Sequence, residues 1–533
     1  MGNVGGKKIY RAAVPVDVES VVVPIVFIPG LMATRLRKKG GGKTIWDPDD
    51  PIWMLRNFTR GTKYDSSNPY SEPSIWDVKN VDMDYNKVRS LIGFDENPEA
   101  EPIKESPGTS LNEYEYDDEK NRGFPRKYNN DEMKRGFAEC FASSYEKLLR
   151  EMDKEFFTAR RSSIKKFNIM APVEVIGYDW RNYPDKIVEY VENRFTEKKE
   201  KNDPKYEEYL RSRYDDEFKF IIVTHSMGGL IARKLLQKNK KLEERCLGVI
   251  HGDQPVIGAP KSYGFFKKGA ESVNFEIVSE NKRSASISDR ILSNAQGNTA
   301  IDFQYVASSM PGALILLPTD DYKLRDENGK IDNKWITWKI GSDKYRKPIR
   351  DNIGDGPVDG ISKNISIYKY YKEPGYIGLL GREFYKKYPL IVEKFSTNLK
   401  EAEEFHKQIG TGDKIYAHPV TYEISVRDVN TIVGVNLEEI GEKTEDKDKK
   451  EKGIEPDGLG VKLIFSPDGD ETVPLYSQKF LSEKYKDKIK NKTFSKTEHQ
   501  DVYNNNDIRQ YVVDKIEELL LGIFTTIYFD QGK

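Results

Sequence analysis

The sequence contains little cysteine, no long apolar run and almost no net charge, and each absence excludes a class of protein. Two cysteines, Cys140 and Cys246, among 533 residues are too few for a disulfide framework, so we expect both to be small buried core residues. Lys plus Arg number 86 and Asp plus Glu number 87, whereas nucleic-acid-binding proteins usually carry a basic excess. No apolar run approaches the roughly 18 residues of a membrane-spanning helix. We therefore expect no nucleic-acid partner and no transmembrane segment.

We expect no secretory signal peptide or myristoylation site in the first residues of the sequence. Its first residues, MGNVGGKKIYRAAV, contain no apolar core of a secretory signal peptide. Gly6 stands where a myristoylation motif has Ser or Thr. We expect a cytoplasmic protein, or one that is exported without a cleavable signal peptide.

The most informative stretch is FKFIIVTHSMGGLIARKLL, residues 218–236. It begins with an apolar run typical of a strand buried on both faces of a parallel sheet, and apolar residues then recur at helical spacing. Ser226 lies at the junction, followed by Gly228 and Gly229, the small residues that a nucleophile elbow needs where strand and helix pass closely. The pattern predicts a serine nucleophile, although Thr224 stands where the G-x-S-x-G motif has glycine. The alternative is an ordinary helix start capped by Ser226.

A second apolar run, residues 21–28, also predicts a buried strand and ends in Pro29-Gly30-Leu31. Such a turn leaves backbone N–H groups free to point into a crevice at the carboxyl end of the strand. In a hydrolase built on the elbow, the N–H groups of Leu31 and Met227 would together hold the oxyanion. The alternative is a simple turn.

Further strands are expected at residues 172–176 and 246–250, with a helix around 187–195 between the first of them and the elbow segment. This alternation predicts an α/β protein with an open, mostly parallel sheet and helices on both faces. We divide the chain into a first core strand with its oxyanion loop (20–34), a lid and polar excursion (35–135), the core with the elbow (136–262), an inserted cap (263–415) and the C-terminal part of the core (416–533).

A serine nucleophile needs a base and an orienting acid, which in this arrangement follow in the order Ser, Asp or Glu, His. Of the four histidines after Ser226, His251 ends the next strand, too early for an acid to precede it. His406 is expected on a charged helical face, and His418 at the front of a strand-like segment. His499 lies between a short strand and the last helix, where the final strand of the sheet would deliver an imidazole. We therefore predict His499 as the base.

The acid is expected in the turn after residues 461–465, a buried run interpreted as the penultimate strand of the sheet. Asp470 is our choice, and Asp468 in the same turn is the alternative. The ligand spacing of a calcium loop is not met, and no His/Cys spacing indicates zinc. We therefore expect neither a metal nor another cofactor.

Two tryptophans, Trp46 and Trp53, lie in a proline-rich loop. They are expected either to form a small apolar lid that touches lipid or covers the site, or to form a satellite hydrophobic cluster beneath a long loop.

Several motifs from one end of the chain to the other resemble the lecithin:cholesterol acyltransferase family, which includes lysosomal phospholipases and phospholipid:diacylglycerol acyltransferases. They are Ile28-Pro29-Gly30-Leu31, Tyr178-Asp179-Trp180-Arg181, His225-Ser226-Met227-Gly228, Gly258-Ala259-Pro260, Leu316-Leu317-Pro318, Gly469-Asp470-Glu471-Thr472-Val473 and Glu498-His499.

The resemblance implies an α/β-hydrolase fold with inserted cap and lid regions. It also implies a triad, an oxyanion hole and substrate-binding positions: Ser226, Asp470 and His499; Leu31 and Met227; Trp46, Trp53, Tyr178, Asp179, Trp180 and Arg181. Within the last set, Asp179 and Arg181 are expected to pair and Trp180 to line the acyl tunnel.

The family's lid and specificity cysteines are absent, so the hydrolase chemistry carries over better than the acceptor preference. We expect a cofactor-free serine hydrolase of phospholipid or other lipid acyl esters, with transient contact to a membrane surface. The alternatives are an O-acyltransferase to sterol or diacylglycerol, a bacterial lipid-degrading toxin effector, and a catalytically silent binding protein on a hydrolase fold.

Overall fold

The computed structural model of the chain describes residues 21–50, 53–54, 57, 94, 99–105, 128–196, 218–283, 293, 295–297, 299–325, 331–332, 335–339, 365–374, 377–439, 459–486 and 488–530. Most of the excursion expected within residues 35–135 lies outside these residues.

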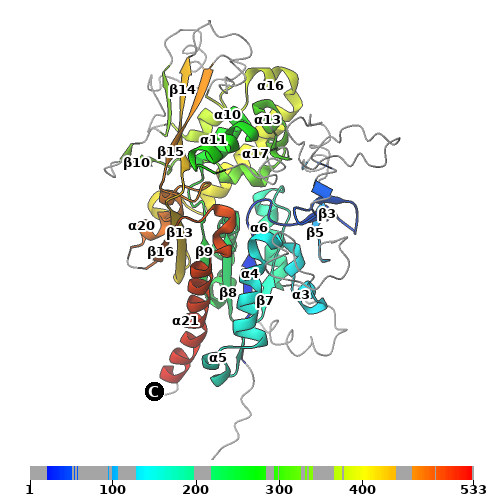
Figure 1. Cartoon of the computed structure of the whole chain (residues 1–533), viewed down its shortest axis with the longest axis vertical. Helices are drawn as coiled ribbons and strands as arrows, with labels where there is room; N and C mark the ends of the chain where they lie inside the picture. The colour runs from blue at the N-terminus through cyan, green and yellow to red at the C-terminus, as the bar shows by residue number, and fades with distance from the viewer. Residues whose placement is uncertain are drawn as a thin grey trace, which may run out of the picture.

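A six-stranded sheet forms the centre of the described part of the chain (Figure 1). Its spatial order is β16-β13-β9-β8-β2-β7, and every neighbouring pair is parallel. The strands are β2 (Ile25–Ile28), β7 (Val173–Val175), β8 (Phe220–His225), β9 (Cys246–Gly252), β13 (Thr421–Arg427) and β16 (Lys490–Ser495).

Strand β2 is the point at which the chain changes the side of the sheet on which it adds strands. The chain runs from β2 to β7 on one side and then returns to place β8 on the other side, with Ile28 paired to Thr224. At such a switch point the connections leave the two strands in opposite directions and open a crevice at their carboxyl ends. The loop after β2 and the turn after β8 therefore meet in this crevice.

The sheet is buried on both faces, which explains the continuous apolar runs in its strands. Ile25 and Phe27 pack into one core and Val26 and Ile28 into another, because successive side chains of a strand point to opposite faces. The first core includes α4 (Ala142–Asp153) and α21 (Asn506–Asp530), and the second α6 (Pro184–Thr196) and α8 (Met227–Lys238).

A cap lies beyond the carboxyl edge of the sheet, at the top of Figure 1. Its helical elements are α10 (Pro260–Lys268), α11 (Ala270–Glu280), α13 (Ala300–Ala307), η4 (Pro311–Leu316), α15 (Ile367–Tyr371), α16 (Arg382–Lys387) and α17 (Pro389–Gln408). A three-stranded sheet completes it, with β12 (Ile336–Lys339), β14 (Thr431–Glu439) and β15 (Leu459–Ser466).

Shorter elements connect and flank these parts. One small sheet contains β3 (Leu36–Lys38), β4 (Thr44–Trp46) and β5 (Ala100–Pro102), and the strand pairs are β1 (Val21–Val22) with β6 (Ile169–Met170) and β10 (Leu324–Arg325) with β11 (Ile331–Asp332). The remaining helical turns are α3 (Asn130–Lys134), η2 (Phe137–Glu139), η3 (Lys154–Thr158), α5 (Ser162–Lys166), α9 (Lys240–Arg245), η5 (Gly412–Lys414), α19 (Leu475–Gln478), α20 (Phe480–Lys484) and η6 (His499–Asn504).

The assignment of residues 461–465 to the main sheet was wrong. These residues lie in β15, which pairs antiparallel with β14 in the cap sheet, and the penultimate strand of the main sheet is β13. A short apolar run predicts burial but does not specify which sheet buries it. The β14–β15 hairpin leaves the end of β13 and returns beside it, where Asp470 bridges to Val429.

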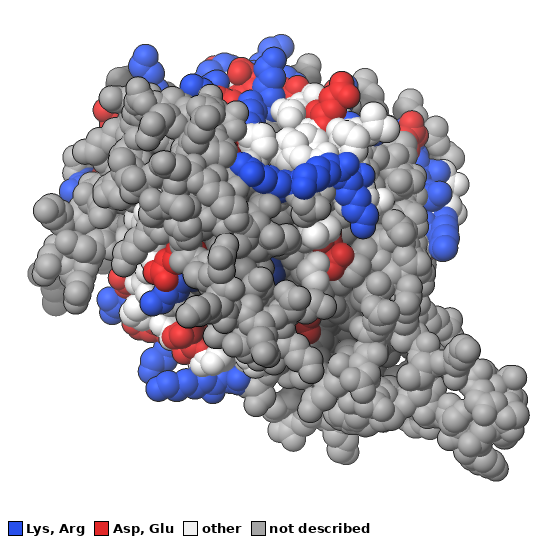
Figure 2. Space-filling view, turned by 90° about the horizontal axis from the view of Figure 1, so that it is seen from above, with Lys and Arg blue, Asp and Glu red and all other residues white. Residues whose placement is uncertain are grey.

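Other expectations from composition can be compared with the structure. Cys140 and Cys246 are both free and buried, which confirms the prediction that they are core residues. None of the described helices combines the length and apolarity needed to cross a bilayer. Basic and acidic side chains are interspersed on the described surface seen from the cap end (Figure 2), in keeping with the balanced charge.

Candidate active site

Ser226 occupies a strained turn between β8 and α8. Its φ of 51° and ψ of −125° are unusual for a residue with a side chain, and its N–H donates to the Gly252 carbonyl at 2.9 Å. Its hydroxyl makes no capping hydrogen bond to α8, which argues against the helix-cap alternative. The side chain instead lines a cavity.

A side chain at Gly228 has no room, because the helix starts against the loop after β2. A Cβ atom on Gly228 would lie 2.3 Å from the Ile28 carbonyl oxygen and 2.5 Å from that of Pro29. Thr224, which departs from the glycine of the motif, is accommodated inside the sheet, where its hydroxyl bonds His251 Nδ1 at 2.9 Å. The departure therefore does not disturb the turn.

The two amides expected to form an oxyanion hole lie at the adjacent strand ends. Leu31 follows β2 and Met227 is the first residue of α8. Neither N–H donates to an acceptor within the described residues. Leu31 lines the same cavity as Ser226, whereas Met227 is not among the cavity residues.

Asp470 and His499 form a buried hydrogen-bonded pair. His499 Nδ1 lies 2.7 Å from Asp470 Oδ2, and the His499 N–H donates to the Asp470 carbonyl at 2.8 Å. The other carboxylate oxygen, Oδ1, accepts the N–H groups of Thr472 and Val473 at 2.9 and 2.6 Å. This arrangement fixes the carboxylate and leaves Nε2 as the free side of the imidazole.

Burial alone would raise the pKa of Asp470, but His499 and the Val473 N–H stabilise its charged form, so its pKa lies below the ordinary value. Among the described residues, no hydrogen bond joins the Ser226 hydroxyl to His499. Both side chains nevertheless line one cavity, and such bonds are often long in the absence of substrate. The alternative acid, Asp468, is exposed to solvent.

A chain of hydrogen bonds behind the serine was not anticipated from the sequence. The Gly30 N–H donates to the Tyr145 hydroxyl at 3.4 Å, and that hydroxyl lies 2.8 Å from His225 Nδ1. His225 Nε2 lies 3.0 Å from the His499 carbonyl. Burial lowers the pKa of His225 to about 3, so it is neutral, accepts from Tyr145 and donates to His499. The position of His225 at the end of an apolar strand was the only feature of the sequence that could have indicated this chain of hydrogen bonds.

The cavity that contains Ser226 has a volume of about 250 Å³. Cap residues provide most of its apolar wall: Phe265, Phe266, Phe303, Val306, Ala307, Met310, Ala313 and Leu314. Its polar wall includes Lys261, Asn274, Gln296 and Glu471. The cavity can therefore accept a ligand with an apolar chain and a polar end.

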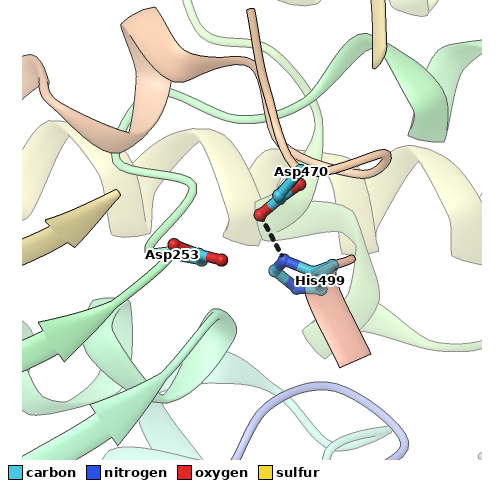
Figure 3. A group of neighbouring side chains, drawn as sticks. All are labelled: Asp253, Asp470 and His499. Atoms are coloured by element: carbon cyan, nitrogen blue, oxygen red, sulfur yellow. Dashed lines mark hydrogen bonds and ion pairs between the residues drawn. The ribbon is translucent and has the colours of Figure 1, made fainter. Parts of the chain in front are cut away.

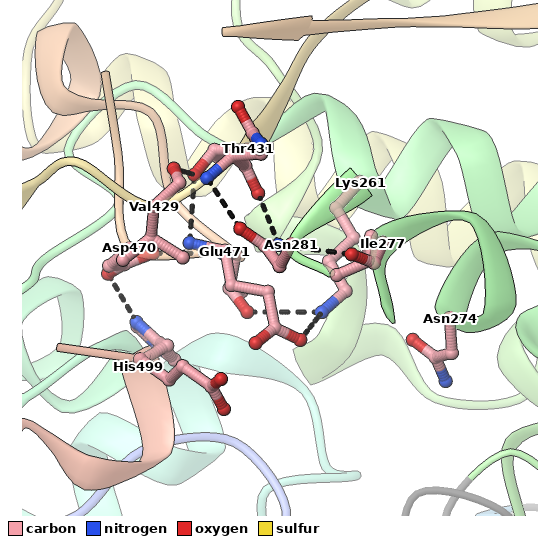
Figure 4. A network of polar contacts seen from close by, with 12 residues as sticks. Lys261, Asn274, Ile277, Asn281, Val429, Thr431, Asp470, Glu471 and His499 are labelled. Carbon is pink, nitrogen blue, oxygen red and sulfur yellow. Dashed lines mark hydrogen bonds and ion pairs between the residues drawn. The ribbon is translucent and has the colours of Figure 1, made fainter. Parts of the chain in front are cut away.

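Glu471 lies between Asp470 and Lys261 of the polar wall (Figure 4). Its N–H donates to Thr431 Oγ1 at 2.8 Å, and its carboxylate lies 3.1 Å from Arg283 Nη2 and 3.9 Å from Lys261 Nζ. Glu498 also pairs with Arg283, at 3.3 Å. Burial, followed by the charge of Glu471, raises the pKa of Glu498 to about 7.

The two tryptophans of the proline-rich loop differ in position. Trp46 lines the cavity, is buried, and packs edge to face against Trp180 with ring centroids 6.1 Å apart. Its Nε1 donates to the Met32 carbonyl at 2.7 Å. Trp53 is partly buried against the same core and is not among the cavity residues. The structure therefore places Trp46 within the core rather than in an exposed lid.

Residues 178–181 hold the loop after β2. Tyr178 donates its hydroxyl to the Pro29 carbonyl at 2.8 Å. Arg181 binds Asp179 with two hydrogen bonds of 2.8 Å. Trp180 lines the cavity. Tyr178, Asp179 and Arg181, which were also expected among the substrate-binding positions, are not cavity residues.

Left-handed backbone geometry recurs around the cavity. Met32, Ser226, Asp253 and Glu471 have φ values of 58°, 51°, 45° and 82°. Met32, Ser226 and Glu471 line the cavity, and Asp253 lies beside Asp470. Residues with side chains adopt this geometry at a cost of roughly 1–3 kcal/mol, and they gather at functional sites. Five other described residues with side chains, Arg160, Asn168, Lys282, Asp428 and Lys496, also have positive φ and do not line the cavity.

Asp253, Asp470 and His499 together could hold a metal ion, since their ligand atoms lie within 4.8 Å of one another (Figure 3). However, the Asp470–His499 hydrogen bond already occupies one ligand atom of each residue. A cation bound by these three residues would have to replace the hydrogen bond between Asp470 and His499.

The other histidines have structural partners. His406 was wrongly expected on a charged face: it is buried, and its Nε2 lies 2.7 Å from the Ile315 carbonyl. Its helix, α17, packs against η4 within the cap, and the charged residues around His406 in the sequence do not reveal this contact. His418 bonds the Val420 and Glu243 carbonyls at 3.0 and 3.3 Å.

The chain was compared with known proteins. No family model and no curated protein matches the sequence. A solved structure described as the crystal structure of the Tle4-Tli4 complex is similar, with a TM-score of 0.62 and 17% sequence identity, and the match covers 94% of this chain and 99% of that chain. The chain has the α/β-hydrolase fold. The turn with Ser226 after β8 and the loop after β2 lie on either side of the switch point of the sheet.

Proposed function

We propose that the protein is a serine hydrolase of lipid acyl esters, of the phospholipase A or lipase type. The observation that carries this proposal is that Ser226 and His499 line one largely apolar cavity, while Asp470 binds His499 from behind. Ser226 projects from a strained turn, and the hydrogen-bonded imidazole faces the same space. These are the parts that an acyl transfer requires.

In the proposed reaction, Ser226 Oγ attacks the ester carbonyl while His499 Nε2 accepts its proton. Asp470 orients the ring and stabilises the imidazolium. The amides of Leu31 and Met227 hold the tetrahedral oxyanion. The imidazolium then protonates the leaving alcohol, which leaves an acyl group on Ser226. Water, deprotonated by the same imidazole, releases the fatty acid and restores the serine.

The walls of the cavity support a lipid substrate. The apolar wall suits an acyl chain, and the polar wall around Lys261 and Glu471 suits the glycerol and head-group end of the same molecule. The resemblance to the lecithin:cholesterol acyltransferase family, which includes phospholipases, supports the same substrate class.

The test compares the purified protein with Ser226→Ala on vesicles that contain phospholipid, sterol and diacylglycerol, with products identified by mass spectrometry. We expect free fatty acid and lysophospholipid from the wild type and a decrease of several orders of magnitude, roughly 10⁴-fold or more, in the variant. Serine-dependent sterol ester or triacylglycerol would identify an O-acyltransferase instead. Full activity of Ser226→Ala would refute the proposal.

A fluorescent phosphonate that labels activated serines provides an independent control. Wild type is expected to become labelled and Ser226→Ala is not. A wild-type protein that stays unlabelled, in a folded state shown by its circular dichroism, would favour a silent binding protein on the same fold.

The similar structure is that of a complex in which Tle4 is bound to Tli4. We propose that this chain, too, has a protein partner, which would fit a lipid-degrading toxin and its inhibitor. The product of the neighbouring gene, added in equal amount to the vesicle assay, should block the release of fatty acid. Unchanged release and no co-purification would remove this part of the proposal.

A further inference from the structure

Asp253 is a buried carboxyl that takes no part in the proposed acyl transfer. It follows β9 and is 0% exposed, and no N–H or O–H group in the described part of the chain donates to its two carboxylate oxygens. A hydrogen bond to the Asp470 carboxylate requires one of the two acids to be protonated. Figure 3 shows it at the end of β9, beside the Asp470–His499 pair. One ligand atom from each of the three residues lies within 4.8 Å of the others. Two carboxyl groups therefore lie close to one imidazole.

The backbone holds Asp253 in this place despite strain. Its φ is 45°, and its N–H donates to the Ile424 carbonyl of β13 at 3.1 Å. Asp and Asn adopt this conformation more readily than other residues with side chains. An Asn at this position should therefore keep the turn, which makes Asp253→Asn a conservative change.

Ionisation of both buried carboxyl groups would cost a large free energy of desolvation and of repulsion between the two charges, so one of them stays protonated. Burial, followed by the charge of Asp470, raises the pKa of Asp253 well above its ordinary value. Asp470 is the ionised partner, because it has the backbone N–H donors and the imidazole. The remaining titratable neighbours are His499 itself and Tyr503, whose pKa is raised by burial and by Asp253.

We propose that Asp253 is a positioning residue for His499, a second carboxyl that shares one proton with Asp470 and can take over the orientation of the imidazole. In either arrangement one negative charge faces the ring, and the other carboxyl stays neutral. This inference rests on the proposed function, because it assigns Asp253 to the same base.

The test measures kcat/KM on p-nitrophenyl butyrate for wild type, Asp470→Asn, Asp253→Asn and the double variant. Replacement of a triad acid by Asn costs about 10⁴-fold in the absence of a substitute. With Asp253 available, we expect Asp470→Asn to lose only about 10²-fold, and its residual activity to rise with pH as Asp253 releases its proton. The double variant should fall to about 10⁴-fold below wild type and lose that pH dependence.

Asp253→Asn alone should lower kcat/KM by less than about tenfold, since the amide keeps a hydrogen-bond donor. Asp468→Asn, in the exposed part of the same turn as Asp470, is the matched control and should leave the activity unchanged. The melting temperature and circular dichroism show that each variant is folded. Ser226→Ala separates the proposed hydrolase function from the proposed role of Asp253. Activity that depends on Ser226 supports the hydrolase function even if replacement of Asp253 has no effect.

Three results would overturn the assignment. One is a double variant no weaker than Asp470→Asn, since Asp253 would then substitute for nothing. Another is a loss in Asp253→Asn as large as in Asp470→Asn, which would make Asp253 the main acid. The third is activity that disappears with EDTA and returns with a divalent cation, which would make the three residues a metal site.

Discussion

Replacement of Gly228 by Ala should damage the active site by forcing the elbow helix away from β2. An added Cβ would lie 2.3 Å from the Ile28 carbonyl oxygen and 2.5 Å from that of Pro29, where ordinary contact begins at 3.4 Å. The difference for Ile28 is 3.4 − 2.3 = 1.1 Å, and backbone atoms cannot rotate away as a side chain can. The helix and the loop that carries Leu31 must separate by about this distance.

A displacement of about 1 Å in a catalytic arrangement costs roughly 10²-fold in rate. Overpacking costs about 3 kcal/mol, and Ala in place of helical Gly returns about 1 kcal/mol, so the free energy of unfolding should fall by about 2 kcal/mol. Ester hydrolysis gives kcat/KM, and chemical unfolding gives the stability.

Gly264→Ala is the matched control for Gly228→Ala, because it is also a helical glycine. Its Cβ would meet the movable ends of Leu463 and Val273 at 3.3 and 3.7 Å. We expect activity close to wild type and a stability change below about 1 kcal/mol. If Gly228→Ala behaved like this control, the close approach of helix and loop would not matter and the reasoning would be wrong.

Two further predictions concern buried polar groups. Tyr145→Phe leaves His225 Nδ1 and the Gly30 N–H without their partner, so stability should fall by about 1–3 kcal/mol and kcat/KM by about tenfold, measured by chemical unfolding and ester hydrolysis. Burial raises the pKa of Glu423 from 4.5 to about 7. Between these two pH values the folded protein keeps a proton on Glu423 that the unfolded chain has lost. The contribution of Glu423 to the free energy of unfolding is therefore highest below about pH 4.5 and falls as the pH rises to about 7. Glu423→Gln should remove about 3 kcal/mol of that pH dependence, measured by unfolding at about pH 5 and pH 8.

Each of these predictions has its own control. Tyr385→Phe removes a partly buried hydroxyl in the cap, which donates to the Lys372 carbonyl at 3.2 Å, and should leave kcat/KM near wild type. Equal losses in Tyr385→Phe and Tyr145→Phe would show that the Tyr145 hydroxyl has no special connection to the site. For Glu423→Gln, a stability profile with the wild-type slope would mean that Glu423 is already ionised in the folded protein.

Local patterns in the sequence were sufficient to predict the central part of the fold. The apolar runs before Pro29 and before Ser226 indicated buried parallel strands because burial on both faces leaves no polar positions. Gly228 indicated a close approach of helix and strand. The prediction of an α/β-hydrolase fold is confirmed by the parallel sheet and the similar solved structure. These features depend on residues near one another in the chain.

The tertiary structure alone decided how distant segments meet. Asp468 and Asp470 are two residues apart, but Asp468 is exposed whereas Asp470 is buried beside His499. Of residues 461–465, expected to be a buried strand of the main sheet, Val461 and Leu463 are buried, Lys462 is exposed, and the strand belongs to the cap sheet. The sequence contains no local sign of these outcomes, because they depend on how the β14–β15 hairpin returns to the end of β13.

The surroundings of Asp253 and His225 also could not be predicted from the sequence. Asp253 gains its importance only because β9, the turn with Asp470 and the loop with His499 converge. His225 was visible in the motif, but its bonds to Tyr145 and to the His499 carbonyl join segments 80 and 274 residues away. The sequence determined the strands and the serine turn through local sterics and burial. The environment of each buried polar group was decided by long-range packing.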